Sequence, residues 1–187
     1  MTDGSAGWTR RAAPLAAALV VLAALVASAS SLGNGFALDD VLVIERRALV
    51  HSLGDLRALL TTAYWQLPPE DTLWRPLGLV TFAAQWGAGG GAPWVFHAVS
   101  VMLYVSVCLA VLALAWQLMP PVGALAAALV FAVHPVHVES VGNIVGQLEL
   151  WVAVAVVAAA AVYARARLHD RLRAPQMLAV QIGRAHV

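Results

Sequence analysis

An all-α, polytopic membrane protein is the fold class that the sequence predicts, and three observations lead to it. Hydrophobic residues make up 61% of the 187 residues, charged residues only 11%, and the mean hydropathy is +0.80. Uncharged runs long enough to cross a bilayer recur along the chain, and arginines cluster near both ends. The sequence therefore predicts about four transmembrane helices, with amphipathic interfacial helices in the first external loop.

Charge balance and cysteine content exclude several classes of protein. The formal net charge is +1, and all eleven cationic side chains are arginine. Such a chain lacks the basic patch of a nucleic-acid-binding protein, so no nucleic-acid partner is expected. The single cysteine, Cys108, excludes an internal disulfide and a cysteine-based metal site.

The chain is expected to begin with a cytoplasmic tail, 1–14, followed by a first transmembrane helix, 15–32. Arg10 and Arg11 precede this apolar run. The run has about 18 residues and reaches about 27 Å, close to the thickness of a ~30 Å hydrocarbon core. A charged start followed by small residues is also typical of a cleavable signal peptide, and we favour an uncleaved anchor over that alternative.

The external loop, 33–94, contains many of the ionisable residues and is the expected working surface. Apolar residues at helical spacing predict an interfacial helix at 53–65, ended by Pro68 and Pro69, and a second at 77–86. Four tryptophans are expected to be interfacial anchors rather than core residues: Trp65, Trp74, Trp86 and Trp94.

Three more transmembrane helices are expected, at 95–119, 120–133 and 134–163. The third has about 12 residues, which is short for a bilayer unless the membrane thins locally. The final segment, 164–187, is expected to be a cytoplasmic tail because it begins with several arginines, in agreement with the arginines at the other end. Residues 181–187 match a translated sequencing adapter and are expected to be artefactual.

Asp39 and Asp40 form an acidic pair just outside the first predicted helix. Adjacent carboxylates in a turn point in different directions, so one can face a reacting group while its neighbour orients an amide or a cation. A solvated loop or a helix N-cap is the alternative interpretation. A carboxylate base at one of these two positions is the chemistry that we favour.

A second polar motif begins at His134 and Pro135. In a helix that starts at Pro135, three polar residues, Glu139, Asn143 and Gln147, recur every four positions and share one face. Ionisable groups inside a membrane cost about 2.5 kcal/mol or more each, so this face should line a cavity or contact a partner. A helix-packing seam, with glycines for close approach, is the alternative.

A metal site would need ligands from His134, His137 and Glu139, with His97 as a further histidine. The spacing is not that of two histidines one helical turn apart on the same face. No bound metal is therefore expected.

Four stretches together resemble one family of enzymes. They are Asn34 to Asp40, Trp74 to Leu77, Gly91 to His97 and Phe131 to Leu150. They are similar to the amino-terminal part of the transmembrane O-mannosyltransferases with tetratricopeptide repeats, and of their bacterial relatives. These belong to the GT-C class of glycosyltransferases, which use lipid-phosphate sugars. The resemblance covers 33–163 and implies that the chain is an amino-terminal fragment, inactive on its own.

The resemblance also implies roles for particular residues. The acidic pair of that family supports acceptor activation, which points to Asp39 and Asp40 as catalytic residues. Residues expected to bind the donor phosphate or the acceptor are Arg75, His134, His137, Glu139 and Asn143. Relatives usually have Gly-Arg-Ala-Glu or Gly-Arg-Ala-Asp where this chain has Gly146-Gln147-Leu148-Glu149, so a cation that could neutralise the donor phosphate is missing.

Two functions follow as hypotheses. The first is transfer of a sugar, with mannose expected, from a polyprenyl-phosphate donor to a hydroxyl of a protein or glycan acceptor. That reaction would occur on the external face of the membrane, in a bacterium on the periplasmic face of the inner membrane, and would need no cofactor beyond the lipid-linked sugar. The alternative is a noncatalytic polytopic membrane subunit or transporter fragment, whose polar face packs against partner helices.

The predicted topology places both termini inside and 33–94 outside. A cysteine introduced at Ser52 should therefore react with a membrane-impermeant reagent added from the outside, whereas one at Ser5 should not. Labelling at Ser5 together with protection at Ser52 would overturn this topology.

Overall fold

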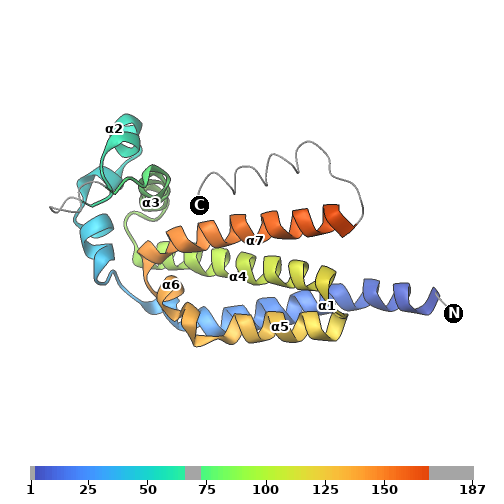
Figure 1. The fold of residues 1–187 in the computed structure, drawn as a ribbon. Coiled ribbons are helices and arrows are strands. Elements are labelled where there is room, and N and C mark those ends of the chain that lie inside the picture. Colours follow the sequence, from blue (N-terminus) through green and yellow to red (C-terminus); the bar gives the residue numbers. More distant parts are fainter. Residues whose placement is uncertain (1–2, 66–72, 169–187) are drawn as a thin grey trace. The chain divides into compact units, whose positions relative to one another are not determined.

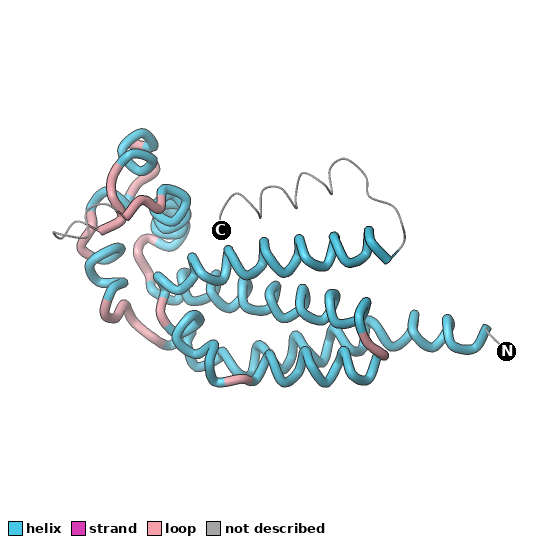
Figure 2. The backbone as a smooth tube through the Cα atoms, in the orientation of Figure 1, coloured by secondary structure: helices cyan, strands magenta, loops and turns pink. Residues whose placement is uncertain are grey.

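The computed structural model describes residues 3–65 and 73–168, and every regular element within them is helical. The predicted all-α class is confirmed. The helices that contain the apolar segments are α1 (Asp3–Ser28), α4 (Pro93–Leu118), α5 (Pro121–Val133) and α7 (Gln147–Leu168), shown in Figures 1 and 2. The chain divides into two compact units. The span unit comprises Met1–Ala29, Val101–His137 and Glu149–Val187, and the loop unit comprises Ser30–Ser100 and Val138–Leu148.

Three helical segments are long and apolar enough to cross a bilayer: Ala12–Gly33, Pro93–Leu118 and Ile144–Leu168. A fourth crossing would be formed by Pro121–Val133 together with Pro135–Gly142, a pair bent by 46°. The protein is thus a multi-pass membrane protein with three or four spans, as predicted. Helix α1 begins well before the expected start of the first span at position 15, so part of the predicted tail is helical.

Within the span unit, α1 packs against α5 through small side chains. Each helix buries a row with four-residue spacing: Ala16, Val20 and Ala24 in α1, and Ala124, Ala128 and Ala132 in α5. Small residues let two backbones approach closely, which is the main source of attraction between helices in lipid.

A hydrogen bond joins α4 to the end of α5 in the same unit. The hydroxyl of Tyr104 is shared between the carbonyl oxygens of Ala132, at 2.9 Å, and Phe131, at 3.3 Å. The last carbonyls of a helix have no partner within it, so this hydroxyl supplies a donor that the bilayer cannot.

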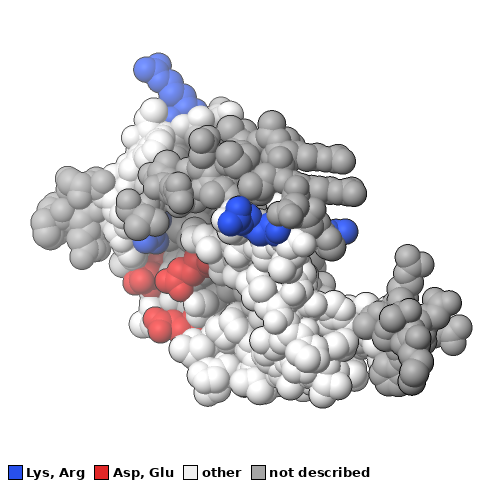
Figure 3. Space-filling model, turned by 45° about the vertical axis from the view of Figure 1, so that its right-hand side comes forward, with Lys and Arg blue, Asp and Glu red and all other residues white. Residues whose placement is uncertain are grey.

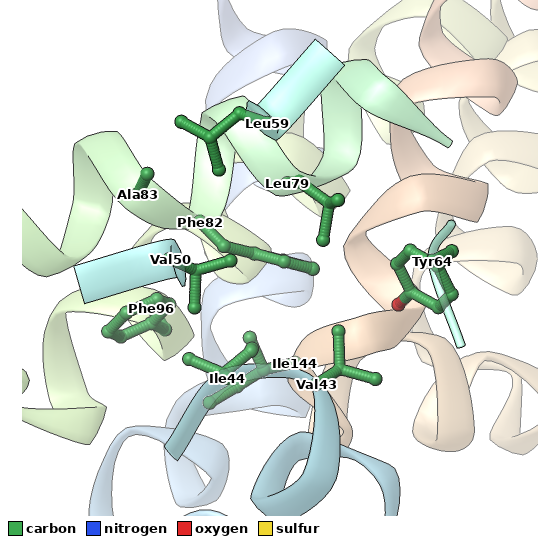
Figure 4. Packing of buried hydrophobic residues seen from close by; sticks show 10 residues of the cluster. All are labelled: Val43, Ile44, Val50, Leu59, Tyr64, Leu79, Phe82, Ala83, Phe96 and Ile144. Atoms are coloured by element: carbon green, nitrogen blue, oxygen red, sulfur yellow. The ribbon is translucent and has the colours of Figure 1, made fainter. Parts of the chain in front are cut away.

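The loop unit consists of short helices with an apolar core of its own. Its elements are η1 (Ala29–Gly33), η2 (Val41–Glu45), η3 (Ala48–His51), α2 (Leu56–Thr61), α3 (Pro76–Gly89), α6 (Val138–Gly142) and η5 (Ile144–Gly146). Figure 4 shows the ten buried residues of the core: Val43, Ile44, Val50, Leu59, Tyr64, Leu79, Phe82, Ala83, Phe96 and Ile144. One more short helix, η4 (Pro135–His137), belongs to the span unit.

The first predicted interfacial helix is shorter than expected. Helix α2 starts after Asp55, whose Oδ1 accepts a hydrogen bond from the N–H of Ala58 at 2.9 Å, and it ends at Thr61. The chain then turns extended because the N–H of Tyr64 bonds the carbonyl of Leu73 instead of a helical partner. Pro68 and Pro69, expected to end this helix, lie outside the described residues. The second predicted helix is present as α3.

The tryptophans divide into two pairs. Trp74 and Trp94 are 64% and 60% exposed, so their role as interfacial anchors stays a prediction. Trp65 and Trp86 are partly buried and pack against the core of the loop unit, so the expectation that they lie outside a core is wrong. Trp86 also stacks on His51 with ring centroids 3.6 Å apart. Whether a tryptophan is exposed or packs against the core depends on tertiary contacts. Its position in the sequence does not indicate these contacts.

Candidate functional site

A strained turn sets the directions of the two acidic side chains. Leu38, directly before the pair, has a φ of 50°, a conformation that is unusual for a leucine. The N–H of Asp40 bonds the carbonyl of Ala37 at 3.0 Å, which closes the turn. Asp40 is 1% exposed, whereas Asp39 is only partly buried and Leu38 is 81% exposed. The turn therefore directs Asp40 inward and leaves Asp39 accessible.

The carboxylate of Asp40 binds the second polar motif. Its Oδ2 accepts a hydrogen bond from the N–H of Ile144 at 3.2 Å, and its Oδ1 accepts one from the N–H of Val145 at 2.9 Å. These groups begin a helical stretch, Ile144–Leu168, whose first N–H groups have no helical partner. The alternative that an acidic residue caps a helix is thus correct for Asp40, although the helix lies 104 residues further along the chain.

The expected polar face of one continuous helix from Pro135 is wrong. Helix α6 ends at Gly142, and Asn143 is extended, with φ −105° and ψ 126°. The break leaves N–H groups free to bind Asp40. Gly146 is required beyond the break, because a Cβ there would lie 2.7 Å from the carbonyl oxygen of Ser140. Glu139, Asn143 and Gln147 consequently do not share a helical face.

Gln147 lies inside the core of the loop unit. It is fully buried and exchanges two amide hydrogen bonds with Gln85, at 3.0 and 3.1 Å. Its Nε2 also donates to the carbonyl of Phe96 at 2.8 Å. The side chain of Gln147 therefore joins α3, α4 and the start of α7 through hydrogen bonds.

Burial governs the acidity of the groups around the turn. It raises the pKa of the Asp40 carboxyl above its ordinary value, while the N–H groups of Val145, Ile144 and Ala37 and the nearby His97 oppose that rise. Burial also raises the pKa of the Tyr64 hydroxyl, which therefore keeps its proton. The charges acting on Tyr64 come from Arg75, Asp40, Asp39 and Arg47.

Two residues of this neighbourhood were not expected from the sequence to belong to a site. Tyr64 falls in the interfacial helix that the sequence predicts at 53–65, but it lies in the core, with the guanidinium of Arg75 5.3 Å from its ring centroid. Arg47 is 4% exposed and donates to the carbonyls of Tyr64, at 2.6 Å, and Ala63, at 2.8 Å. Helical spacing alone gave no signal for either residue.

The remaining candidates separate between the two units. Arg75, Glu139 and Asn143 are in the loop unit with the acidic pair, and the Oδ1 of Asn143 is buried without a hydrogen-bond partner. His134 and His137 are in the span unit, with ring centroids 6.2 Å apart, and His137 lies 4.3 Å from the ring of Phe131. Among the described residues no group of three or more His, Cys, Asp and Glu is arranged to hold a metal ion. Figure 3 shows that charged side chains interrupt a mostly uncharged surface.

The relatives found by comparison with known proteins are all named protein O-mannosyl-transferases. Protein O-mannosyl-transferase Tmtc1 of Drosophila melanogaster is 36% identical over 132 residues, which are 68% of this chain and 15% of that protein. TMTC1 of Homo sapiens is 34% identical over 145 residues, covering 72% of this chain and 16% of that protein. The chain belongs to the family of the TMTC protein O-mannosyl-transferases.

A third relative of the same family, TMTC3 of Mus musculus, is 29% identical over 145 residues, covering 75% of this chain and 16% of that protein. No family model and no solved structure matches the chain. The chain thus spans 15 to 16% of the length of these three TMTC relatives.

Replacing Asp40 with alanine should destabilise the loop unit. The change leaves the N–H groups of Ile144 and Val145 without an acceptor, at a cost of about 1–3 kcal/mol for each group that stays buried. Denaturant unfolding in detergent should show a loss of about 2–4 kcal/mol. The matched control, Glu45→Ala, removes an exposed acid and should change stability little. Equal effects of the two variants would contradict the capping role.

The same carboxyl predicts a pH dependence of stability. Because the pKa of Asp40 is raised above 3.8 on folding, the folded state binds more protons than the unfolded state between these two values. The proton-linked part of the contribution of Asp40 to the free energy of unfolding is complete below about pH 3.8 and is lost as the pH rises through the folded pKa, while its two hydrogen bonds to Ile144 and Val145 remain. The thermal midpoint of the wild type minus that of Asp40→Asn should therefore fall as the pH is raised from about 4 to about 7. If the difference between the two thermal midpoints grows over this pH range, the pKa of Asp40 is lowered on folding and not raised.

Proposed function

We propose that this chain carries the acceptor-activating part of an enzyme that transfers mannose from a polyprenyl-phosphate donor to a hydroxyl group of a protein. The observation that supports this most directly is the difference in burial between the two acidic residues. Asp40 is buried and engaged with two backbone N–H groups, while Asp39 is partly exposed next to it. One carboxylate is thereby held rigidly and the other is left for an incoming hydroxyl.

Asp39 acts as the general base in the proposed reaction. It takes the proton of a serine or threonine hydroxyl from within about 2.6–3.2 Å while the hydroxyl oxygen attacks the anomeric carbon of the sugar. The bond between that carbon and the phosphate oxygen breaks, and polyprenyl phosphate leaves with the electron pair. Attack opposite the leaving group inverts the configuration of the sugar.

Asp40 is a positioning residue in this scheme. Its hydrogen bonds to Ile144 and Val145 fix the turn from which Asp39 projects, so the base does not need to be ordered when the acceptor binds. Arg75 is exposed beside Tyr64 and is the proposed cation for the leaving phosphate.

The other candidates are assigned to binding. Glu139 and Asn143 belong to the loop unit and would contact the acceptor or the donor there. His134 and His137 belong to the span unit, and the donor-binding role that the resemblance implies for them stays a prediction apart from the site in the loop unit. The site is proposed to face the exterior, since the arginines near both ends of the sequence favour an internal location for those ends.

The decisive experiment is replacement of Asp39 by asparagine in the complete enzyme that carries this segment. The change keeps the shape of the side chain and removes the base, so the turnover number should fall by about 10²- to 10⁴-fold. Mannose transfer to an acceptor peptide is measured together with the thermal midpoint, which should change little because Asp39 is partly exposed.

Asp40→Asn serves as the comparison, because it alters the residue that orients the turn rather than the proposed base. Wild-type turnover in Asp39→Asn would refute the assignment of the base. Wild-type turnover in both variants would favour the alternative of a noncatalytic membrane subunit.

A further inference from the structure

Tyr64 is held in place at every point except its hydroxyl. Its N–H bonds the carbonyl of Leu73 at 2.6 Å, and its own carbonyl accepts from Arg47, also at 2.6 Å. The ring of Trp65 packs against it edge-on, with centroids 5.4 Å apart. The side chain is 1% exposed, yet the Oη atom has no hydrogen-bond partner among residues 3–65 and 73–168.

A buried hydroxyl without a partner makes tyrosine less stable than phenylalanine at the same position. Native proteins keep such groups rarely, and a partner that arrives with a ligand is one physical reason to keep one. In Figure 4 the hydroxyl oxygen lies on the side of the ring turned toward Val43 and Ile144, the residues packed beside the Asp40 contact. The unpaired donor therefore belongs to the neighbourhood of the acidic pair.

Arg75 is the part of this arrangement that can move. It is exposed, and its guanidinium lies 5.3 Å from the centroid of the Tyr64 ring. A cation–π contact at an exposed position is weak, whereas two parallel hydrogen bonds from a guanidinium to a phosphate are much stronger. An anion at this place would draw Arg75 off the ring and uncover Tyr64.

Neighbouring groups favour a phosphate as that anion. Arg47 adds a second guanidinium close to Tyr64, and its Nε is also buried without a partner. Burial raises the pKa of the Tyr64 hydroxyl, so the group keeps its proton and can donate a hydrogen bond to a phosphate oxygen. The side-chain amide of Gln147 is already hydrogen-bonded to Gln85 and to the carbonyl of Phe96, so it is not free to donate to an anion.

We propose that Tyr64 and Arg75 form a phosphate-binding pair beside Asp39. Arg75 leaves the ring of Tyr64 to hold the phosphate of a polyprenyl-phosphate lipid, and the Tyr64 hydroxyl donates a hydrogen bond to one of the phosphate oxygens. The proposal rests on the proposed function and adds to it the contact that holds the donor.

The test is a binding titration of the complete enzyme that carries this segment, solubilised in detergent, with a short-chain polyprenyl phosphate that carries no sugar. Tyr64→Phe removes one oxygen atom and should weaken binding by about tenfold. The thermal midpoint of the unliganded variant should stay equal or rise, because an unsatisfied hydroxyl has been removed. Tyr163→Phe, which makes the same change on the exposed surface of α7, should alter neither quantity.

Arg75→Gln provides a second variant whose folding is not at risk, because the side chain is exposed. It should weaken binding at least as much as Tyr64→Phe. Unchanged affinity in Tyr64→Phe or in Arg75→Gln would overturn the proposal, as would a wild-type chain that binds no polyprenyl phosphate.

Competition experiments distinguish the sources of phosphate. Displacement of polyprenyl phosphate by inorganic phosphate, weaker in Tyr64→Phe, would support recognition of the phosphate group itself. Equal affinity for phosphatidylglycerol would overturn the assignment to the donor. The proposed function is judged separately, because Asp39→Asn should lower the turnover number by about 10²- to 10⁴-fold without weakening polyprenyl-phosphate binding.

Discussion

The loop unit depends on one contact: the carboxylate of Asp40 accepts hydrogen bonds from the N–H groups of Ile144 and Val145. It connects two stretches that lie 104 residues apart in sequence and stabilises the break in the helix at Asn143. Without an acceptor at this point, the chain would have two N–H groups exposed to an apolar core. Ile144 can enter that core only because its N–H is satisfied from outside its own helix.

Several locally unfavourable features gather around this contact. Leu38 adopts a positive φ, Asp40 is buried at a cost that raises its pKa, and Tyr64 and Asn143 each keep a buried polar atom without a partner. Each would be removed by a simple substitution if stability were the only requirement. Such features concentrate at functional sites because the surrounding structure maintains them for another purpose. Their position beside Asp39 is a reason, independent of the relatives, to look for chemistry there.

The span unit and the loop unit are packed with different kinds of side chain. The span unit uses rows of alanine and valine between α1 and α5, since close backbone approach is what holds helices together in lipid. The loop unit instead buries aromatic and branched side chains such as Phe82, Phe96 and Ile44 in a core like that of a soluble domain. A segment between two spans can therefore be rigid enough to hold a base and its neighbours in register.

By itself, the sequence determined the class of the protein and the approximate spans, and it singled out the acidic pair, whose catalytic role stays a prediction. These follow from local composition, because a run of apolar residues has only one stable arrangement in a bilayer and a carboxylate pair next to it stands out. The bend near His134 and the break at Asn143 left the number of spans at three or four. Only the tertiary structure decided that Asp40 caps a distant helix, that Gln147 pairs with Gln85 and that Tyr64 lies in a core. Helical periodicity predicted an unbroken stripe through Glu139, Asn143 and Gln147, because it registers local preference alone. Two hydrogen bonds, donated by the N–H groups of Ile144 and Val145 to a carboxylate far away in sequence, outweigh that preference, and no local pattern records them.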